Sequence, residues 1–187
     1  DFRNEGMDKT HNPEFTCMEI YVAYKDYNWM MSFVEKMLEK ISTEVNGTTE
    51  LTIGEHKVNF KPPYRRLPIL DAIKEYAGVD VSGMDEAQLR ETCKKLNVEV
   101  EPSMGKGKLI DAIFGEYAED KLIDPTFIID YPVEMSPLTK RHRSNPELTE
   151  RFELFVCGKE LANAYSELND PIDQFERFQE QARLKSN

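Results

Sequence analysis

Cysteine is scarce in this sequence, and its spacing excludes two kinds of site. The three cysteines, Cys17, Cys93 and Cys157, stand far apart and form no Cys-x-x-Cys pair. A disulfide framework or a zinc site needs paired or clustered thiols, so neither is expected. Each cysteine is predicted to be a small apolar filler, as free cysteines usually are, in a protein of the reducing cytoplasm.

Long apolar runs and a signal peptide are also missing. No stretch approaches the ~20 consecutive apolar residues that a membrane-spanning helix needs, and no charged start followed by an apolar segment opens the chain. We therefore expect no membrane partner. Because the chain begins at Asp1 inside a strand pattern, we expect it to be an excerpt of a longer protein.

Positive charge is in deficit, with 24 Lys and Arg against 35 Asp and Glu and a net charge of −11. Gripping a phosphate backbone needs clustered Lys and Arg, so broad electrostatic attraction to nucleic acid is excluded and any RNA contact would be local. The one basic cluster is Lys140-Arg141-His142-Arg143. It could touch a phosphate, but such short runs are usually solvated loops, and we prefer the loop.

The residues that are present describe one folded domain. Of 187 residues, 40% are apolar and 32% charged, which suits one sizeable core with a small insertion. Apolar spacing predicts helices over 29–46, 68–77, 85–96, 106–121 and 171–182. Short apolar or alternating stretches predict strands at 50–60, 126–130 and 151–169, with a loop at 136–146. The first helix is expected to pack through Trp29, Phe33, Met37 and Ile41, and the last through Ile172, Phe175, Phe178 and Ala182.

The segment Met104-Gly105-Lys106-Gly107-Lys108 has two interpretations. Glycines before a helix can expose backbone donors to an anion, which favours a phosphate loop. The segment lacks the full glycine-lysine-serine/threonine pattern of such loops. A turn that leads into a helix is the better interpretation.

The opening of the chain is predicted to form two strands joined by a polar loop. In the second strand, 15–24, alternate residues make one apolar and one polar face. A polar face is usually just solvated, but Arg3 and Glu5 share a parity on the partner strand. An Arg fork suits phosphate, a Glu can accept from an amino group, and Phe15 offers a flat surface. Together these groups suit a nucleotide.

Two blocks of residues resemble a known family. Residues 2–6, 10–16 and 18–21 resemble motif 2 of the class II aminoacyl-tRNA synthetases in its lysyl form, and residues 151–155 with 158–170 resemble the lysyl segment that precedes motif 3. Residues 125–128 and 131–138 between them also match. The resemblance covers essentially the whole chain, as a central fragment of the catalytic domain.

The resemblance implies an α+β fold, with an antiparallel sheet flanked by helices and a small helical insertion. Residues 1–63 would supply the motif 2 hairpin, a helix and a short hairpin of the catalytic core. Residues 64–122 would be the helical insertion, and residues 123–187 the remaining core strands and a C-terminal helix. All three would belong to one partial catalytic domain.

The activity that the resemblance implies is ATP-dependent activation of L-lysine to lysyl-adenylate and its transfer to tRNA(Lys), in a cytoplasmic homodimer that uses Mg²⁺. Arg3 would be catalytic, holding the α-phosphate of ATP and the lysine carboxylate; from the residues alone it could equally be a surface ion pair. Glu5 would accept from the adenine amino group, His11 would lie by the outer phosphates, and Phe15 would stack on adenine.

Acidic residues supply the other implied roles. Glu153 and Glu160 match the family's magnesium carboxylates, and hard Mg²⁺ prefers oxygen ligands; unaided, both would be interpreted as solvated. Their opposite parities require a turn or bulge between them, which Gly158 could supply. The lysine pocket would be formed by Glu19, Tyr21, Asn163, Tyr165 and Glu167 together with Arg3. Acidic and aromatic groups suit an ammonium on an aliphatic stem.

Two departures from the family pattern leave alternatives open. Motif 1 and the glycine-rich motif 3 have no counterpart in residues 1–187, so the isolated chain is expected to be inactive. A related enzyme that attaches lysine-like groups to an elongation factor shares the catalytic fold. A non-catalytic folded fragment is the third reading.

Overall fold

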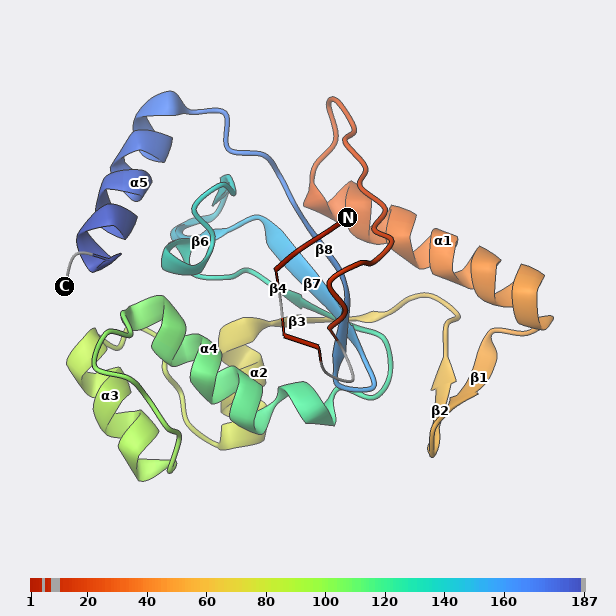
Figure 1. Ribbon diagram of the computed structural model, residues 1–187, viewed down its shortest axis with the longest axis horizontal. Coiled ribbons are helices and arrows are strands. Elements are labelled where there is room, and N and C mark those ends of the chain that lie inside the picture. The colour runs from red at the N-terminus through yellow and green to blue at the C-terminus, as the bar shows by residue number, and fades with distance from the viewer. Residues whose placement is uncertain (5, 8–10, 186–187) are drawn as a thin grey trace.

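The computed structural model describes residues 1–4, 6–7 and 11–185. Its centre is a four-stranded sheet in the order β3-β4-β7-β8 (Figure 1). The strands are β3 (Arg65–Pro68), β4 (Thr126–Ile129), β7 (Arg151–Val156) and β8 (Lys159–Tyr165). The β3–β4 pair is parallel and the other two pairs are antiparallel. The predicted α+β class is confirmed, with one parallel pair that the prediction did not include.

Helices cover the two faces of this sheet separately. One face packs on α1 (Tyr27–Asn46), and the other on α2 (Ile69–Ala77), α3 (Glu86–Lys95) and α4 (Lys106–Tyr117). Figure 1 shows α1 on one side of the strands and α2, α3 and α4 grouped on the other. The remaining elements are α5 (Pro171–Lys185), the 3-10 helices η1 (Glu119–Lys121) and η2 (Val133–Met135), and the strand pairs β1 (Glu50–Ile53) with β2 (His56–Asn59) and β5 (Arg141–His142) with β6 (Asn145–Thr149).

Alternate residues of β4 and β7 enter two different cores. Phe127, Phe152 and Leu154 pack with Tyr27 and Met31 of α1. Ile128 and Phe155 point the other way and pack with the helices α2 to α4. Because strand side chains alternate between faces, Glu153 lies on the face of α4. This placement decides where the candidate site can form.

The longer helices begin and end at residues that the sequence marks. Asp26 caps α1 by accepting from the Trp29 amide at 3.0 Å, and Gly47 ends it with φ 74°. Asp85 starts α3 in a capping box with Gln88, in which each side chain accepts from the backbone amide of the other residue. Ile41 was expected in the core but is 49% exposed, because it lies outside the buried stripe of α1, which includes Met31 and Val34.

One strand inside the predicted helical segment was missed. Residues 65–68 form β3, which pairs with β4, and only then does α2 begin. Four residues are too few for periodicity to identify, and the strand is stabilised by a partner about sixty positions away in the sequence. The hairpin predicted at 50–60 is confirmed as β1 and β2.

The predicted N-terminal hairpin is wrong in its extent. Its described part holds one bridge, between Phe2 and Glu14, with the Arg3 amide donating to the Pro13 carbonyl at 3.0 Å. Residues 15–24 are assigned to no strand in the structure, and Met18 and Tyr21 are 63% and 85% exposed. A strand is stable only when its backbone groups pair with a neighbour, and alternation alone does not supply one. Exposed Cys17 lies here too, so of the three cysteines only Cys93 is fully buried.

The basic cluster 140–143 is not a solvated loop. Residues 141–142 pair with β6, Arg141 binds Asp173 at 3.0 Å, and Arg143 binds both Asp26 at 2.8 Å and Glu150 at 2.7 Å. Glu150 is 3% exposed, and a buried carboxylate needs such a partner. These arginines therefore stabilise the fold.

The C-terminal helix was also predicted with the wrong buried face. Ile172, Phe175 and Phe178 are exposed, whereas Arg177 is 7% exposed. Arg177 donates to the carbonyls of Ser136 at 3.0 Å and Thr139 at 2.7 Å. Polar contacts thus dock α5, and Ile172, Phe175 and Phe178 stay outside the core. No helix in the described ranges has the length and apolar character that crossing a membrane requires.

Gly107 tests how closely α4 packs against η2. A Cβ there would lie 3.0 Å from Met135 Cγ and 3.3 Å from the Glu134 carbonyl, so Gly107→Ala should lower the free energy of unfolding by about 1–3 kcal/mol through overpacking. Gly115→Ala in the same helix meets only Glu119 Oε2, at 3.8 Å, and should be neutral or stabilising by up to ~1 kcal/mol. Urea unfolding of both variants measures the difference. Equal stabilities would contradict the close approach.

Candidate active site

The pairing of β7 with β8 gathers the polar side chains on one face. Glu153 lies opposite Asn163, Leu154 opposite Ala162, and Phe155 opposite Glu160. Leu161 is therefore an extra residue, a β-bulge that shifts the parity of β8. As a result Glu160, Asn163 and Glu153 share the face covered by α4.

The turn predicted between Glu153 and Glu160 forms at Gly158, which has φ 67°. It pairs Phe155 with Glu160, so Glu160 shares the face of Glu153, and the bulge at Leu161 then brings Asn163 onto that face. A Cβ at Gly158 would lie 3.1 Å from Asp120 Cα, so the turn is also closely packed. A glycine marks this turn in the sequence, whereas the bulge that follows it is set by strand pairing.

Glu153 is held from several directions. Its Oε2 accepts from the Tyr131 hydroxyl at 2.8 Å, and its Oε1 accepts from the Arg151 guanidinium and from Asn163 Nδ2, the latter at 3.3 Å. The Arg151 guanidinium also lies 4.7 Å from the centroid of the Tyr131 ring. These contacts fix a carboxylate that would otherwise rotate freely.

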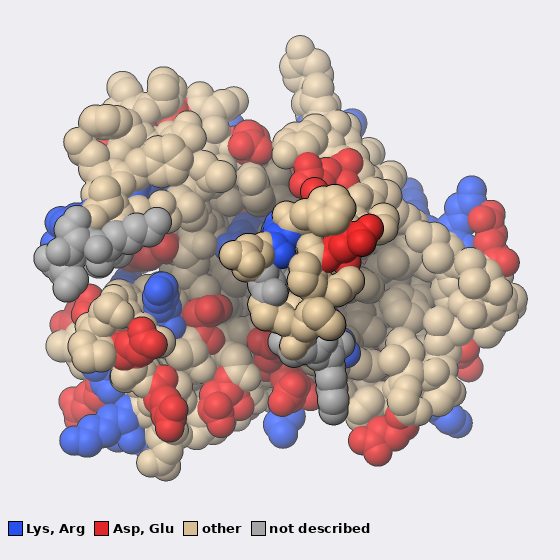
Figure 2. Space-filling view, viewed as in Figure 1, with Lys and Arg blue, Asp and Glu red and all other residues tan. Residues whose placement is uncertain are grey.

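A cavity of about 500 Å³ opens between α4 and this face of the sheet. Its charged lining comes from Lys108, Asp111, Glu119, Glu134, Arg151, Glu153 and Glu160. Acidic groups outnumber basic ones, so the cavity favours a cation or a ligand that brings one. On the face drawn in Figure 2, acidic and basic side chains are interspersed.

Burial and mutual repulsion raise the pKa of three of these acids. Burial raises the pKa of Glu160, and the nearby charge of Glu153 raises it further, while Asn163 and Arg151 oppose the rise. The pKa of Asp111 is raised by burial and then by Glu153. Burial, followed by the charge of Asp120, raises the pKa of Glu119. Such shifts are common where function requires like charges to converge.

Four of the residues predicted for the lysine pocket, Glu19, Tyr21, Asn163 and Glu167, lie around Tyr165, and Arg3 is not among them. Tyr165 lies opposite Arg151 in the β7–β8 pair, next to Asn163 on the same face. Burial raises the pKa of the Tyr165 phenol, and Glu167, Tyr21 and Glu19 raise it as well. Because Glu19 and Tyr21 raise the pKa of Tyr165, residues 19–21 of the N-terminal segment lie near the end of β8.

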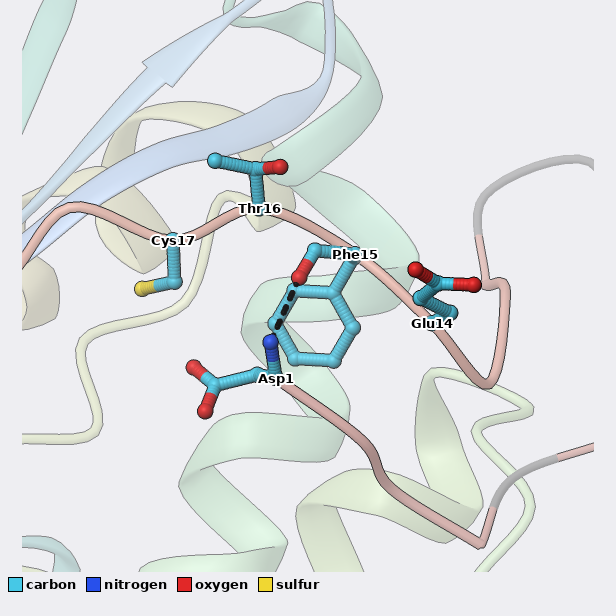
Figure 3. A pocket seen from close by; sticks show the side chains of 5 residues that line it. All are labelled: Asp1, Glu14, Phe15, Thr16 and Cys17. Atoms are coloured by element: carbon cyan, nitrogen blue, oxygen red, sulfur yellow. Dashed lines mark hydrogen bonds between the residues drawn. The ribbon is translucent and has the colours of Figure 1, made fainter.

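The residues predicted for the nucleotide form a second group. The Arg3 guanidinium lies 5.5 Å from the centroid of the Phe15 ring. Phe15 lines a shallow hollow with Asp1, Glu14, Thr16 and Cys17, and the Asp1 amino group donates to the Phe15 carbonyl at 2.9 Å (Figure 3). Neither Arg3 nor Phe15 is among the described residues that line the larger cavity. His11 is exposed, and Glu5 lies outside the described residues.

Comparison with known proteins decides the family. The sequence family described as tRNA synthetases class II (D, K and N) matches residues 1–187. The chain belongs to this family of class II tRNA synthetases. It is 69% identical over 183 residues to lysine–tRNA ligases of Christiangramia forsetii and Porphyromonas gingivalis, and 64% identical to that of Azobacteroides pseudotrichonymphae. These matches cover 98% of the chain but only 32%, 32% and 37% of the relatives, so the chain spans about a third of their length.

The structure adds residues to this candidate site that the sequence did not predict. Arg151 and Tyr131 contact Glu153 directly, and Asp111 lines the same cavity from α4. A signal for Arg151 was available, since it shares the parity of Glu153 two positions away. Tyr131 and Asp111 carry no such signal, because each reaches the site through tertiary packing.

The donor set of the cavity fits Mg²⁺. Glu153 and Glu160 present carboxylate oxygens on one face, and a divalent cation would offset the repulsion that raises the pKa of Glu160. In the part of the chain that the structure describes, no three His, Cys, Asp or Glu side chains gather closely enough to hold a metal ion. Two carboxylates suit an ion that takes its other oxygens from phosphates and water.

The raised pKa of Glu160 predicts that its ionised carboxylate destabilises the fold at neutral pH. A carboxyl whose pKa is above its ordinary 4.5 when folded stabilises the fold in acid, and this contribution is lost as the pH rises through the folded pKa. Glu160→Gln should therefore raise the free energy of unfolding at neutral pH in metal-free buffer. The gain should be a fraction of a kcal/mol, because solvent screens a partly exposed group.

Urea unfolding between about pH 4 and about pH 7.5 measures this effect. The gain should shrink towards the acid end, where Glu160 is protonated in both states. Glu116→Gln, an exposed residue of α4, is the matched control and should follow the wild type. A stability of Glu160→Gln below that of the wild type at neutral pH would contradict the prediction.

Proposed function

We propose that the full-length protein is a lysine–tRNA ligase, which activates L-lysine with ATP and transfers it to tRNA(Lys). The observation that carries the proposal is the convergence of acidic and aromatic side chains on one face of β7 and β8, in a chain 69% identical to lysine–tRNA ligases. An acidic, partly aromatic pocket suits the ammonium and stem of lysine. An acidic substrate side chain would be repelled there.

In the first step the lysine carboxylate attacks the α-phosphorus of ATP, and pyrophosphate leaves with the electrons of the broken P–O bond. Arg3 would hold both reacting groups, because a guanidinium fork can bridge an α-phosphate and a carboxylate. Phosphoryl-centred displacement depends mainly on such positioning and charge stabilisation. The contact of Arg3 with Phe15 supports a shared place for phosphate and adenine.

The nucleotide and the metal would be held by separate groups. Phe15 would stack on adenine, Glu5 would accept from its amino group, and His11 would lie by the outer phosphates. Glu153 and Glu160 would hold Mg²⁺, which offsets the negative charge of the phosphates and of the departing pyrophosphate. Their shared face, which the turn at Gly158 sets by pairing Phe155 with Glu160, supports this assignment.

The amino acid would lie against β8 and the N-terminal segment. Glu167 and Glu19 would bind the ammonium groups of lysine through charge-assisted hydrogen bonds, with Asn163 as a neutral partner. Tyr165 and Tyr21 would contact its stem. In the second step a ribose hydroxyl of the tRNA attacks the activated carbonyl, and AMP leaves.

The proposal extends to the organisation of the parent protein. Residues 1–63 and 123–187 would belong to one catalytic domain interrupted by the insertion 64–122, in a cytoplasmic homodimer. The chain covers 32% of the length of its relatives, which supports the further proposal that the isolated chain is inactive. That coverage also keeps the non-catalytic fragment as a second reading for the isolated chain.

The lysine pocket can be tested by calorimetry on the full-length protein. L-lysine is titrated in the presence of Mg²⁺ and an ATP analogue that cannot release pyrophosphate. Glu167→Gln should weaken binding by about 10- to 100-fold, because a hydrogen bond to a charged group is worth about 1.5–3 kcal/mol. Glu147→Gln, an exposed residue of β6, serves as the control.

Norleucine, which keeps the α-ammonium and the aliphatic stem but lacks the side-chain ammonium of lysine, separates charge from shape. It should bind weakly to the wild type and be unaffected by Glu167→Gln. Tight lysine binding by the Glu167→Gln variant would refute the pocket assignment. If the folded wild type binds no lysine, the lysyl function itself fails.

A further inference from the structure

Arg151 makes more polar contacts than an ion pair with Glu153 requires. Besides Glu153, its NH1 group donates to the Met135 carbonyl and to Ser136 Oγ, each at 3.0 Å, and its Nε donates to Asn163 Oδ1 at 3.3 Å. Its side chain is 17% exposed. The planar guanidinium therefore ties η2 and both strands of the site to one orientation.

Tyr131 supplies the second half of this arrangement. Its ring is 2% exposed and packs in the core with Ile128 and Phe155. The ring therefore cannot follow a moving partner, and its hydroxyl presents a fixed donor 2.8 Å from Glu153 Oε2. The Arg151 guanidinium lies over the same ring, so the two residues support each other.

The acceptor sites of Glu153 can be counted from these contacts. A carboxylate has about four lone-pair sites, two on each oxygen. Oε1 accepts hydrogen bonds from Arg151 and Asn163, and Oε2 accepts one only from Tyr131 among the described contacts. One lone pair of Oε2 is left, on the carboxylate that shares the cavity with Glu160.

We propose that Arg151 and Tyr131 are positioning residues that orient the Glu153 carboxylate so that Oε2 remains available to a divalent cation. The inference rests on the proposed function, in which Glu153 holds Mg²⁺. Neither residue touches the cation or the reacting atoms. Each acts through Glu153, as the partners of metal ligands commonly do.

Two conservative variants separate positioning from charge. Arg151→Lys keeps the positive charge but cannot reach Glu153, Asn163 and the η2 acceptors together, since an ammonium is a compact donor on a flexible stem. Tyr131→Phe keeps the buried ring and removes only the hydroxyl. Both should weaken binding of the cation by about 10- to 100-fold, the usual effect of losing such a partner.

Matched controls exist elsewhere in the chain. Tyr64 is also buried, and its hydroxyl donates to the Phe60 carbonyl at 2.9 Å. Arg90 also forks between a carboxylate and backbone carbonyls, those of Glu101 and Pro102. Tyr64→Phe and Arg90→Lys therefore lose comparable contacts without touching Glu153. They show how much of any effect comes from general destabilisation.

The experiment is a titration of Mn²⁺, a spectroscopic stand-in for Mg²⁺ with the same oxygen preference. Electron paramagnetic resonance follows Mn²⁺ binding to the full-length protein with ATP present and lysine absent. The wild type, Glu153→Gln, the two positioning variants and the two controls are compared, and the melting temperature of each is recorded. Turnover is then measured against Mg²⁺ concentration.

The inference predicts weaker Mn²⁺ binding for Glu153→Gln, Arg151→Lys and Tyr131→Phe, with both controls like the wild type. High Mg²⁺ should restore turnover in the positioning variants, because the ligand itself is still present. If Glu153→Gln weakens binding while both positioning variants match the wild type, the inference is overturned and the magnesium assignment stands. If Glu153→Gln binds Mn²⁺ as the wild type does, both the inference and the magnesium assignment fail.

Discussion

The antiparallel pairing of β7 with β8 is the interaction on which the rest of the structure depends. A strand has only two faces, and β7 uses both: Phe152 and Leu154 enter the core under α1, whereas Glu153 and Phe155 face α4. Neither face could be exchanged for the other, because a one-residue slip would bury the charges and expose the aromatic rings. The bulge at Leu161 shifts this alternation at one point, and so brings Asn163 and Tyr165 onto the face that Glu153 and Glu160 share.

Converging carboxylates make this face functional and also unfavourable for folding. Burial and mutual repulsion raise the pKa of Glu160, Asp111 and Glu119, which means that the ionised forms oppose the folded state at neutral pH. The stabilising contribution comes from the apolar packing beneath, where Phe114 and Phe155 lie with ring centroids 5.6 Å apart. A bound cation would thus relieve the repulsion between these carboxylates, and the apolar core beneath them forms without it.

Features set by neighbouring residues in the chain were predicted correctly, and features set by residues distant in sequence were not. The end of α1 at Asn46 and the start of α3 at Asp85 were predicted, because a helix boundary is set within a few residues. Residues 65–68 were missed as a strand and 15–24 were wrongly assigned to one, because strand formation depends on a partner distant in sequence. The apolar stripe of α5 was predicted to be buried for the same reason: periodicity reports amphipathicity, and burial depends on what lies opposite.

The same distinction applies within the site. The types of residue that bind a cation were readable, since paired glutamates in a recognisable block predict oxygen ligands, and the turn at Gly158 that brings them to one face was predicted too. The bulge that adds Asn163 to that face was not predicted, because no local pattern marks it. Arg151 escaped attention although it stands two positions from Glu153, because its other partners, Met135, Ser136 and Asn163, reach it only after the chain has folded. A ligand is defined by its own chemistry and can be read from sequence. The residues that orient it are defined by geometry, and only the folded chain identifies them.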